Sequence, residues 1–153
     1  MKTLLCILLF SFLFLACSTE GKPDSSSLPI KGTWRLLTGT LIQKGDTVVT
    51  DYTKNSSFIK IINDSHFAFF QHDLNKGKDS TPVFSAGAGK YSLKDSTYTE
   101  HLEYCSAREW ENNDFTFTVE IHNDTLTQRG VEKVDSLGIN RLNIERYVRL
   151  KAD

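Results

Sequence analysis

The chain is poor in the residues that build disulfide frameworks, zinc sites and nucleic-acid-binding surfaces. Among its 153 residues there are three cysteines, three prolines and one methionine. The four histidines are scattered, and no pair has the spacing of a zinc motif, so we expect no metal site. The 18 basic and 19 acidic side chains nearly cancel, and the basic ones never form a run. This balance excludes the strongly basic surface that nucleic acid requires.

A helical period and a catalytic motif are also missing. After residue 30, only a short turn over 106–112 is expected to be helical. The glycine-rich segment 84–91 lacks both the first glycine and the Ser or Thr of a phosphate-binding loop. We therefore predict neither a cofactor nor an enzyme. The competing hypothesis is that Glu100 or Glu145 acts as an acid or base in a dry cavity.

The N-terminus, in contrast, is informative. Lys2 precedes an apolar run that ends at Ala16, which is typical of a signal peptide over 1–16 and too short for a membrane span. The sequence Leu15-Ala16-Cys17 resembles the lipobox of bacterial lipoproteins. This resemblance implies cleavage before Cys17 and acylation of that residue, which attaches the protein to a membrane of the cell envelope. Ser18 after the cysteine resembles lipoproteins of the outer membrane. An ordinary cleaved signal followed by a free thiol is the alternative.

A polar segment separates this anchor from the rest of the chain. Residues 17–30 are rich in serine and include two prolines, so we expect a flexible tether. A single domain should follow over 31–153, because the remaining length suffices for one core and not for two. With Cys17 acylated, Cys105 is the one cysteine left, and no disulfide can form within the mature chain.

Alternating apolar and polar residues predict an all-β domain. In the segment 115–122 the alternation is strict, so its four apolar side chains share one face. Asn and Asp turn signals separate neighbouring segments, and strands joined this tightly are antiparallel. Many short strands linked by hairpins indicate a sandwich or an up-and-down barrel. We predict strands near 33–42, 47–52, 57–63, 66–72, 84–94, 96–105, 114–122, 124–131 and 141–150.

Two motifs at opposite ends of the domain favour the barrel. Gly32-Thr33-Trp34 begins the first strand, and Tyr147-Val148-Arg149 nearly ends the last. This pairing resembles the calycin superfamily of lipocalins and fatty-acid-binding proteins, in particular small lipocalin-like lipoproteins of Bacteroidetes. The resemblance implies a single antiparallel up-and-down β-barrel of about eight to ten strands, closed at one end by Trp34 with Arg149 over its ring. Segment 38–46 lacks the helix pair that fatty-acid-binding proteins insert after the first strand.

Side chains alternate between the two faces of a strand, and this alternation, here called strand parity, indicates which of them face the interior. The interior of a barrel of this size can hold one small ligand. Glu100 and Glu145 fall on the inner face, and a buried carboxylate must be paired or protonated. We expect Arg149 to pair with Glu145, and Gln128 or a tyrosine hydroxyl to reach Glu100. A single bulge would invert this parity. The candidate ligand cavity comprises Phe58, Phe67, Phe69, Tyr98, Glu100, Tyr104, Phe115, Phe117, Gln128, Glu145 and Tyr147.

The preferred function is therefore that of a lipid-anchored envelope barrel that binds a small apolar or amphipathic ligand, with the carboxylates as its polar anchor. The alternative is a filled barrel that binds an envelope partner through its loops. Trp110 and Arg108 in segment 105–111 would then supply the contact, because Trp and Arg dominate binding hot spots. A tryptophan that folds back over the mouth of the barrel is the competing interpretation of Trp110. The carboxylates could also form a purely structural network.

Overall fold

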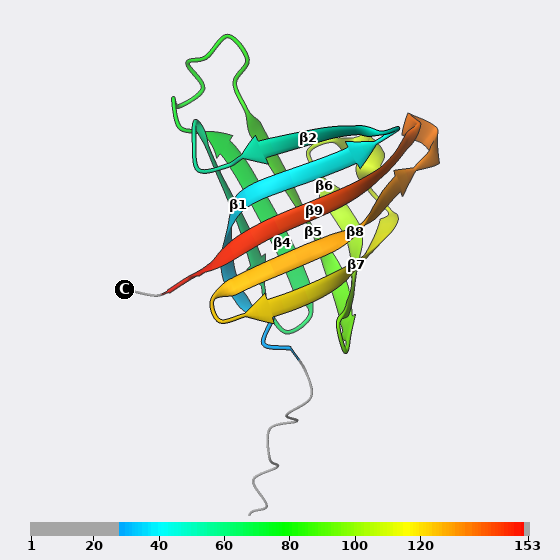
Figure 1. The fold of residues 1–153 in the computed structure, drawn as a ribbon. Helices are drawn as coiled ribbons and strands as arrows, with labels where there is room; N and C mark the ends of the chain where they lie inside the picture. Colours follow the sequence, from blue (N-terminus) through cyan, green and yellow to red (C-terminus); the bar gives the residue numbers. More distant parts are fainter. Residues whose placement is uncertain (1–27, 152–153) are drawn as a thin grey trace, which may run out of the picture.

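The structure is a computed structural model that describes residues 28–151 (Figure 1). The predicted signal peptide, Cys17 and most of the predicted tether lie outside the described residues. No helix of the described part of the chain is long and apolar enough to cross a membrane. Its elements are β1 (Gly32–Gln43), β2 (Asp46–Asp51), β3 (Ser56–Ile62), β4 (His66–Asp73), β5 (Phe84–Lys94), β6 (Thr97–Cys105), β7 (Asn113–His122), β8 (Thr125–Val134) and β9 (Ile139–Leu150), with 3-10 turns η1 (Arg108–Trp110) and η2 (Asp135–Leu137).

The first strand closes the sheet into a barrel. β3 to β9 follow one another as antiparallel neighbours, and β1 pairs with β9 along almost its whole length. On its other edge β1 pairs with β3 through its first four residues and with β2 through its last six. Eight strands thus form the closed barrel, and β2 is an additional strand on β1 (Figure 1). The all-β antiparallel up-and-down barrel expected from the sequence is confirmed.

The predicted strands correspond to the observed ones, with differences at two ends. β8 continues to Val134 and β9 begins at Ile139, so this hairpin is longer on both sides than the alternation indicated. The reason is that the pairing of Val131 to Val134 with Ile139 to Leu142 continues to the tight turn η2. The expected short turn over 106–112 is η1. β1 runs directly into β2, without a helix pair.

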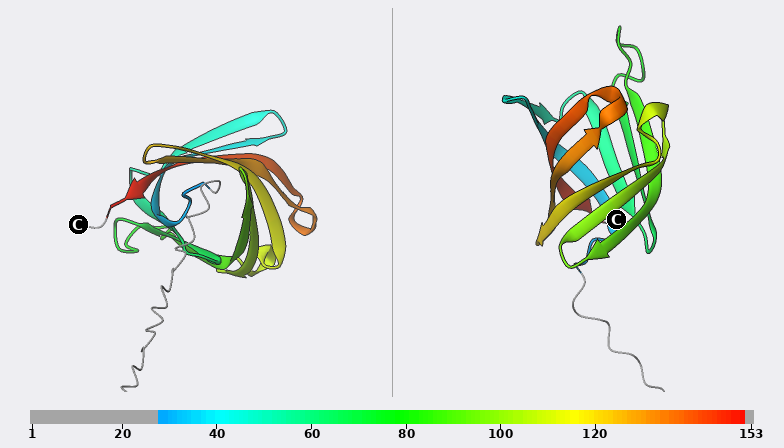
Figure 2. Two further views of the ribbon diagram at one scale, coloured as in Figure 1. Left: turned by 90° about the horizontal axis from the view of Figure 1, so that it is seen from below. Right: turned by 90° about the vertical axis from the view of Figure 1, so that its right-hand side faces the viewer.

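One end of the barrel is closed by residues that precede β1. Ile30 is 2 % exposed and Trp34 is fully buried, and the indole Nε1 donates a hydrogen bond of 2.7 Å to the carbonyl oxygen of Ile30. The guanidinium carbon of Arg149 lies 4.0 Å from the centroid of the Trp34 ring. Seen from this end, the ring of strands encloses the blue segment before β1 (Figure 2). Residues 28–30, which we had assigned to the tether, therefore pack against the barrel.

The same arginine explains the glycine at the start of the first strand. Its Nη1 and Nη2 each donate a 2.6 Å hydrogen bond, to the carbonyl oxygens of Lys31 and Pro29. Gly32 has a φ of +138°, and a Cβ there would lie 2.6 Å from Nη1 of Arg149. Only glycine combines this backbone angle with so close an approach.

A bulge in β6 changes the direction of its last side chains. Gly89 of β5 pairs with Leu102, whereas the preceding residue, Ala88, pairs with Tyr104. Glu103 is thus the extra residue, and the inner and outer faces exchange beyond it. Tyr104 is 66 % exposed on the outside of the barrel. The prediction that Tyr104 lines the cavity is wrong for this reason.

Candidate functional site

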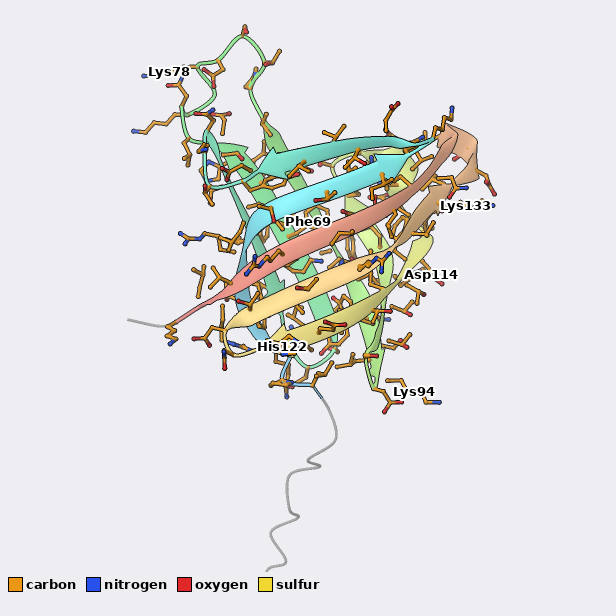
Figure 3. The ribbon with its side chains drawn as sticks, viewed as in Figure 1. Phe69, Lys78, Lys94, Asp114, His122 and Lys133 are labelled. Carbon is orange, nitrogen blue, oxygen red and sulfur yellow. The ribbon has the colours of Figure 1, made fainter. Side chains whose placement is uncertain are left out.

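The barrel contains a cavity of about 260 Å³ at the end opposite Trp34. Ser85 at the start of β5, Cys105 at the end of β6 and Arg141 near the start of β9 lie along it. These positions belong to the end at which β4–β5, β6–β7 and β8–β9 are connected. Phe69 lies within the outline of the barrel, whereas the labelled charged residues lie at its periphery (Figure 3).

Most of the side chains expected in the cavity lie in it or directly beneath it. Seven of the eleven line it: Phe58, Phe69, Glu100, Phe115, Phe117, Gln128 and Glu145. Phe67, Tyr98 and Tyr147 are buried without lining the cavity, at 1 %, 0 % and 0 % exposure. Tyr104 is outside, as described above. Parity thus predicts the inner face correctly on every strand without a bulge at the residue concerned.

Lys60 of β3 is the centre of a buried polar cluster on the cavity wall. Its side chain is 3 % exposed, and its Nζ lies 2.8 Å from Oε1 of Glu100. The same Nζ donates to Oε1 of Gln128 at 3.1 Å and lies 3.9 Å from Oε2 of Glu145. The partners come from three further strands, β6, β8 and β9, so this cluster joins both sides of the barrel across its interior.

Burial and neighbouring charges shift the pKa values of the groups in and beside this cluster. Burial acts to lower the pKa of Lys60, but the charges of Glu100 and Glu145 outweigh it and raise that pKa. Burial raises the pKa of Glu100, and the nearby Lys60 counters only part of this effect. Burial also raises the pKa of Tyr98 and Tyr147 far above that of free tyrosine, with further contributions from the glutamates. Lys60 therefore stays charged, and both tyrosines stay neutral.

Glu145 has a partner different from the one expected. The hydroxyl of Tyr147 donates to its Oε2 at 2.7 Å, whereas Arg149 binds backbone carbonyls at the closed end. The predicted pairing of Glu145 with Arg149 is wrong because the closed end already occupies the guanidinium. Glu100 pairs with Lys60, which was not expected, and the expected tyrosine neighbour is Tyr98, whose hydroxyl acts to lower the pKa of Glu100. Gln128 binds Lys60 and not Glu100. Among the described residues, the hydroxyl of Tyr98 is the one buried side-chain polar atom without a hydrogen-bond partner.

Trp110 lies at the mouth of the cavity and contributes to its lining. Its ring is 5.8 Å from that of Phe115, and the guanidinium carbon of Arg141 lies 5.2 Å from its centroid. Arg141 in turn pairs with Glu132 at 2.7 Å. Trp110 therefore folds back over the mouth, which agrees with the competing interpretation of this residue. Arg108 is exposed and pairs with Glu111.

Lys60 is the one member of this polar cluster that was not predicted from the sequence. A signal for it was present, since Lys60 alternates with Phe58 and Ile62 on the inner face of a strand whose other face also carries isoleucine. A lysine on an apolar inner face needs a carboxylate partner. The two inward glutamates could have been matched to it.

The arrangement offers groups suited to binding a small molecule. Within residues 28–151, no group of three or more His, Cys, Asp or Glu side chains is placed to hold a metal ion. What the cavity combines is aromatic walls with a buried polar cluster, the usual composition of a small-molecule site. No protein-family model matches the chain, and no curated protein is significantly similar to it in sequence.

Proposed function

We propose that the protein is a lipid-anchored barrel of the cell envelope that binds one small apolar or amphipathic molecule in its interior. The observation that carries the proposal is the cavity of about 260 Å³, whose wall contains both aromatic rings and the Lys60 cluster. A barrel that served only as a scaffold would gain stability by filling this volume with side chains. The volume is just below the usual range of ligand pockets, so the ligand is small.

The envelope location is part of the same proposal and is supported by the sequence alone. The lipobox at Leu15-Ala16-Cys17 and the resemblance to lipocalin-like lipoproteins both favour it. Expression of the full chain with Cys17→Ala in a bacterial host tests it. The parent chain should fractionate with membranes and carry an acylated cysteine in its intact mass. Equal membrane association of the two chains would contradict the anchor.

Ligand binding can be tested with a neutral amphipathic probe. We expect 2-phenylethanol, titrated into the isotopically labelled mature chain, to give saturable NMR shifts at the indole of Trp110 and the side-chain amide of Gln128, which line the cavity. The exposed Phe84 lies on the outside of the barrel and is the internal control. Ser85→Trp places a large ring at the cavity and should abolish the shifts. Shifts at Phe84 alone would contradict an interior site.

A further inference from the structure

We propose that the ligand of this cavity is a small organic cation, an ammonium compound with an apolar body, whose charged nitrogen lies at Glu145. This inference rests on the proposed ligand binding and specifies its chemistry. It follows from how the charges along the cavity are already paired. The alternative, an apolar carboxylate such as a fatty acid, would need a cation whose charge the glutamates of the cavity do not already balance.

Both cations along the cavity already face carboxylates of the protein. Lys60 donates to Glu100 and Gln128, and Glu145 lies 3.9 Å from its Nζ. Arg141 binds Glu132 through Nε and covers the ring of Trp110. A carboxylate that entered the cavity would therefore compete with glutamates of the protein for these two cations. It would also approach three glutamates, Glu100, Glu132 and Glu145.

One carboxylate, in contrast, has no cation within hydrogen-bond distance. Glu145 lines the cavity with its side chain 16 % exposed, which is more than Lys60 at 3 % or Glu100 at 8 %. Its nearest cation is Lys60 at 3.9 Å, which is beyond hydrogen-bond distance. Oε2 accepts the hydroxyl of Tyr147, and Oε1 accepts no hydrogen bond from the described residues. An ammonium group near Oε1 would donate a hydrogen bond to this oxygen without disturbing the Lys60–Glu100 pair.

Aromatic rings surround the same position. Phe58 stacks on Phe69 at 5.6 Å with an interplanar angle of 12°, and Tyr52 meets Phe58 edge-on at 5.8 Å. Phe58 also lies 6.4 Å from the ring of Tyr147, the hydrogen-bond donor of Glu145. Aromatic faces attract organic cations, most strongly where water is excluded. The barrel already uses this interaction, since Nζ of Lys60 lies 5.3 Å from the Tyr147 centroid.

Three probes of similar size and different charge test the inference. The full mature chain is titrated with 2-phenylethylamine, 3-phenylpropionate and 2-phenylethanol at pH 7, and NMR shifts at Trp110 report the affinities. We expect the amine to bind at least about tenfold more tightly than the acid, which corresponds to one charge-assisted hydrogen bond. Glu145→Gln should bring the amine and the alcohol to about equal affinity. Glu120→Gln makes the same charge change outside the barrel on β7 and should leave the amine's advantage intact.

The outcomes separate this inference from the proposed function. If the acid binds as tightly as the amine, or if only the alcohol and the acid bind, the cation preference is wrong while the ligand site stands. An unchanged amine-to-alcohol ratio in Glu145→Gln also overturns the assignment to Glu145. If none of the three probes binds, the proposed function and the inference fail together. The comparison of probes on the unmodified chain does not depend on the folding of any variant.

Discussion

At the scale of single residues, the polar interior of the barrel depends on one lysine. Lys60 is almost completely buried and is the closest cation to both Glu100 and Glu145. Taking three ionisable groups out of water carries a desolvation cost, which hydrogen bonds and mutual attraction must offset. The loss of the cation would leave two carboxylates close together in a poorly hydrated site.

Lys60→Met tests this dependence. Methionine has a similar length and no charge, so the variant removes the cation and keeps much of the packing. We expect the free energy of unfolding to fall by about 3–5 kcal/mol, the usual cost of breaking a buried pair. The double variant Lys60→Met with Glu100→Gln should recover part of this loss in urea denaturation. No recovery would show that the carboxylates are not the source of the cost.

Two buried tyrosines provide a matched comparison of hydroxyl groups. Tyr147 donates to Glu145 at 2.7 Å, whereas the hydroxyl of Tyr98 forms no hydrogen bond of good geometry, although Glu100 lies close enough to raise its pKa. Both side chains are fully buried. Tyr147→Phe should therefore cost about 1.5–3 kcal/mol, because it removes a hydrogen bond to a charged group. Tyr98→Phe should cost less than Tyr147→Phe, because a poorly aligned contact contributes less. Equal losses in thermal melting would contradict the assignment of partners.

At the scale of elements, the bulge in β6 shapes the rim of the cavity. By exchanging the faces beyond Glu103, it brings Cys105 to the cavity and places Tyr104 outside. The bulge needs a specific neighbour on β5. A Cβ at Gly89 would overlap the carbonyl oxygen of His101 and come within 2.9 Å of the amide nitrogen of Glu103. Both atoms belong to the backbone and cannot turn aside.

Gly89→Ala is accordingly expected to be strongly destabilising. The backbone of β6 would have to shift, which costs about 3 kcal/mol at the upper end of overpacking effects. Gly138→Ala is the control, because Gly138 has a φ of +64° and nothing lies within 4 Å of its Cβ position. There the cost is the left-handed backbone alone, about 1 kcal/mol. If urea denaturation gave similar losses of unfolding free energy for the two variants, the close approach of the β6 backbone to Gly89 would be contradicted.

The strands were predictable from the sequence because alternation is a local pattern. The strict period of residues 115–122 and the Asn and Asp turns gave the element order, and parity placed Glu100 and Gln128 correctly. The bulge was not predictable, since it depends on Gly89 of the neighbouring strand. The partners of Glu100 and Glu145 were also missed, because they depend on which strands face each other across the interior.

At the scale of the whole molecule, the first and last strands pair to close the barrel. β1 and β9 pair along their length, and Arg149 near the C-terminus binds the carbonyl oxygens of Pro29 and Lys31 before β1. These contacts link residues separated by about 120 positions in the sequence. The closed end thus depends on a long-range interaction, and the cavity lies toward the opposite end.

Arg149→Lys tests the contribution of this closure. Lysine keeps the charge but loses the planar fork that reaches two carbonyls and covers the indole. We expect a loss of about 2 kcal/mol in the free energy of unfolding, of the size found for hydrogen bonds to charged groups. A double-mutant cycle with Trp34→Phe should give a coupling of about 0.5–2 kcal/mol. Additive losses would contradict a direct contact between the guanidinium and the ring.

The most direct test of the interior ligand site is native mass spectrometry of the full mature chain purified from the membranes of its own host. The account predicts one small molecule bound per chain, with a basic nitrogen in its structure. The Ser85→Trp variant, produced in the same way, should lack this molecule, because the added ring occupies the cavity. A parent chain that is free of any bound molecule, or a molecule retained equally by the variant, would contradict the account.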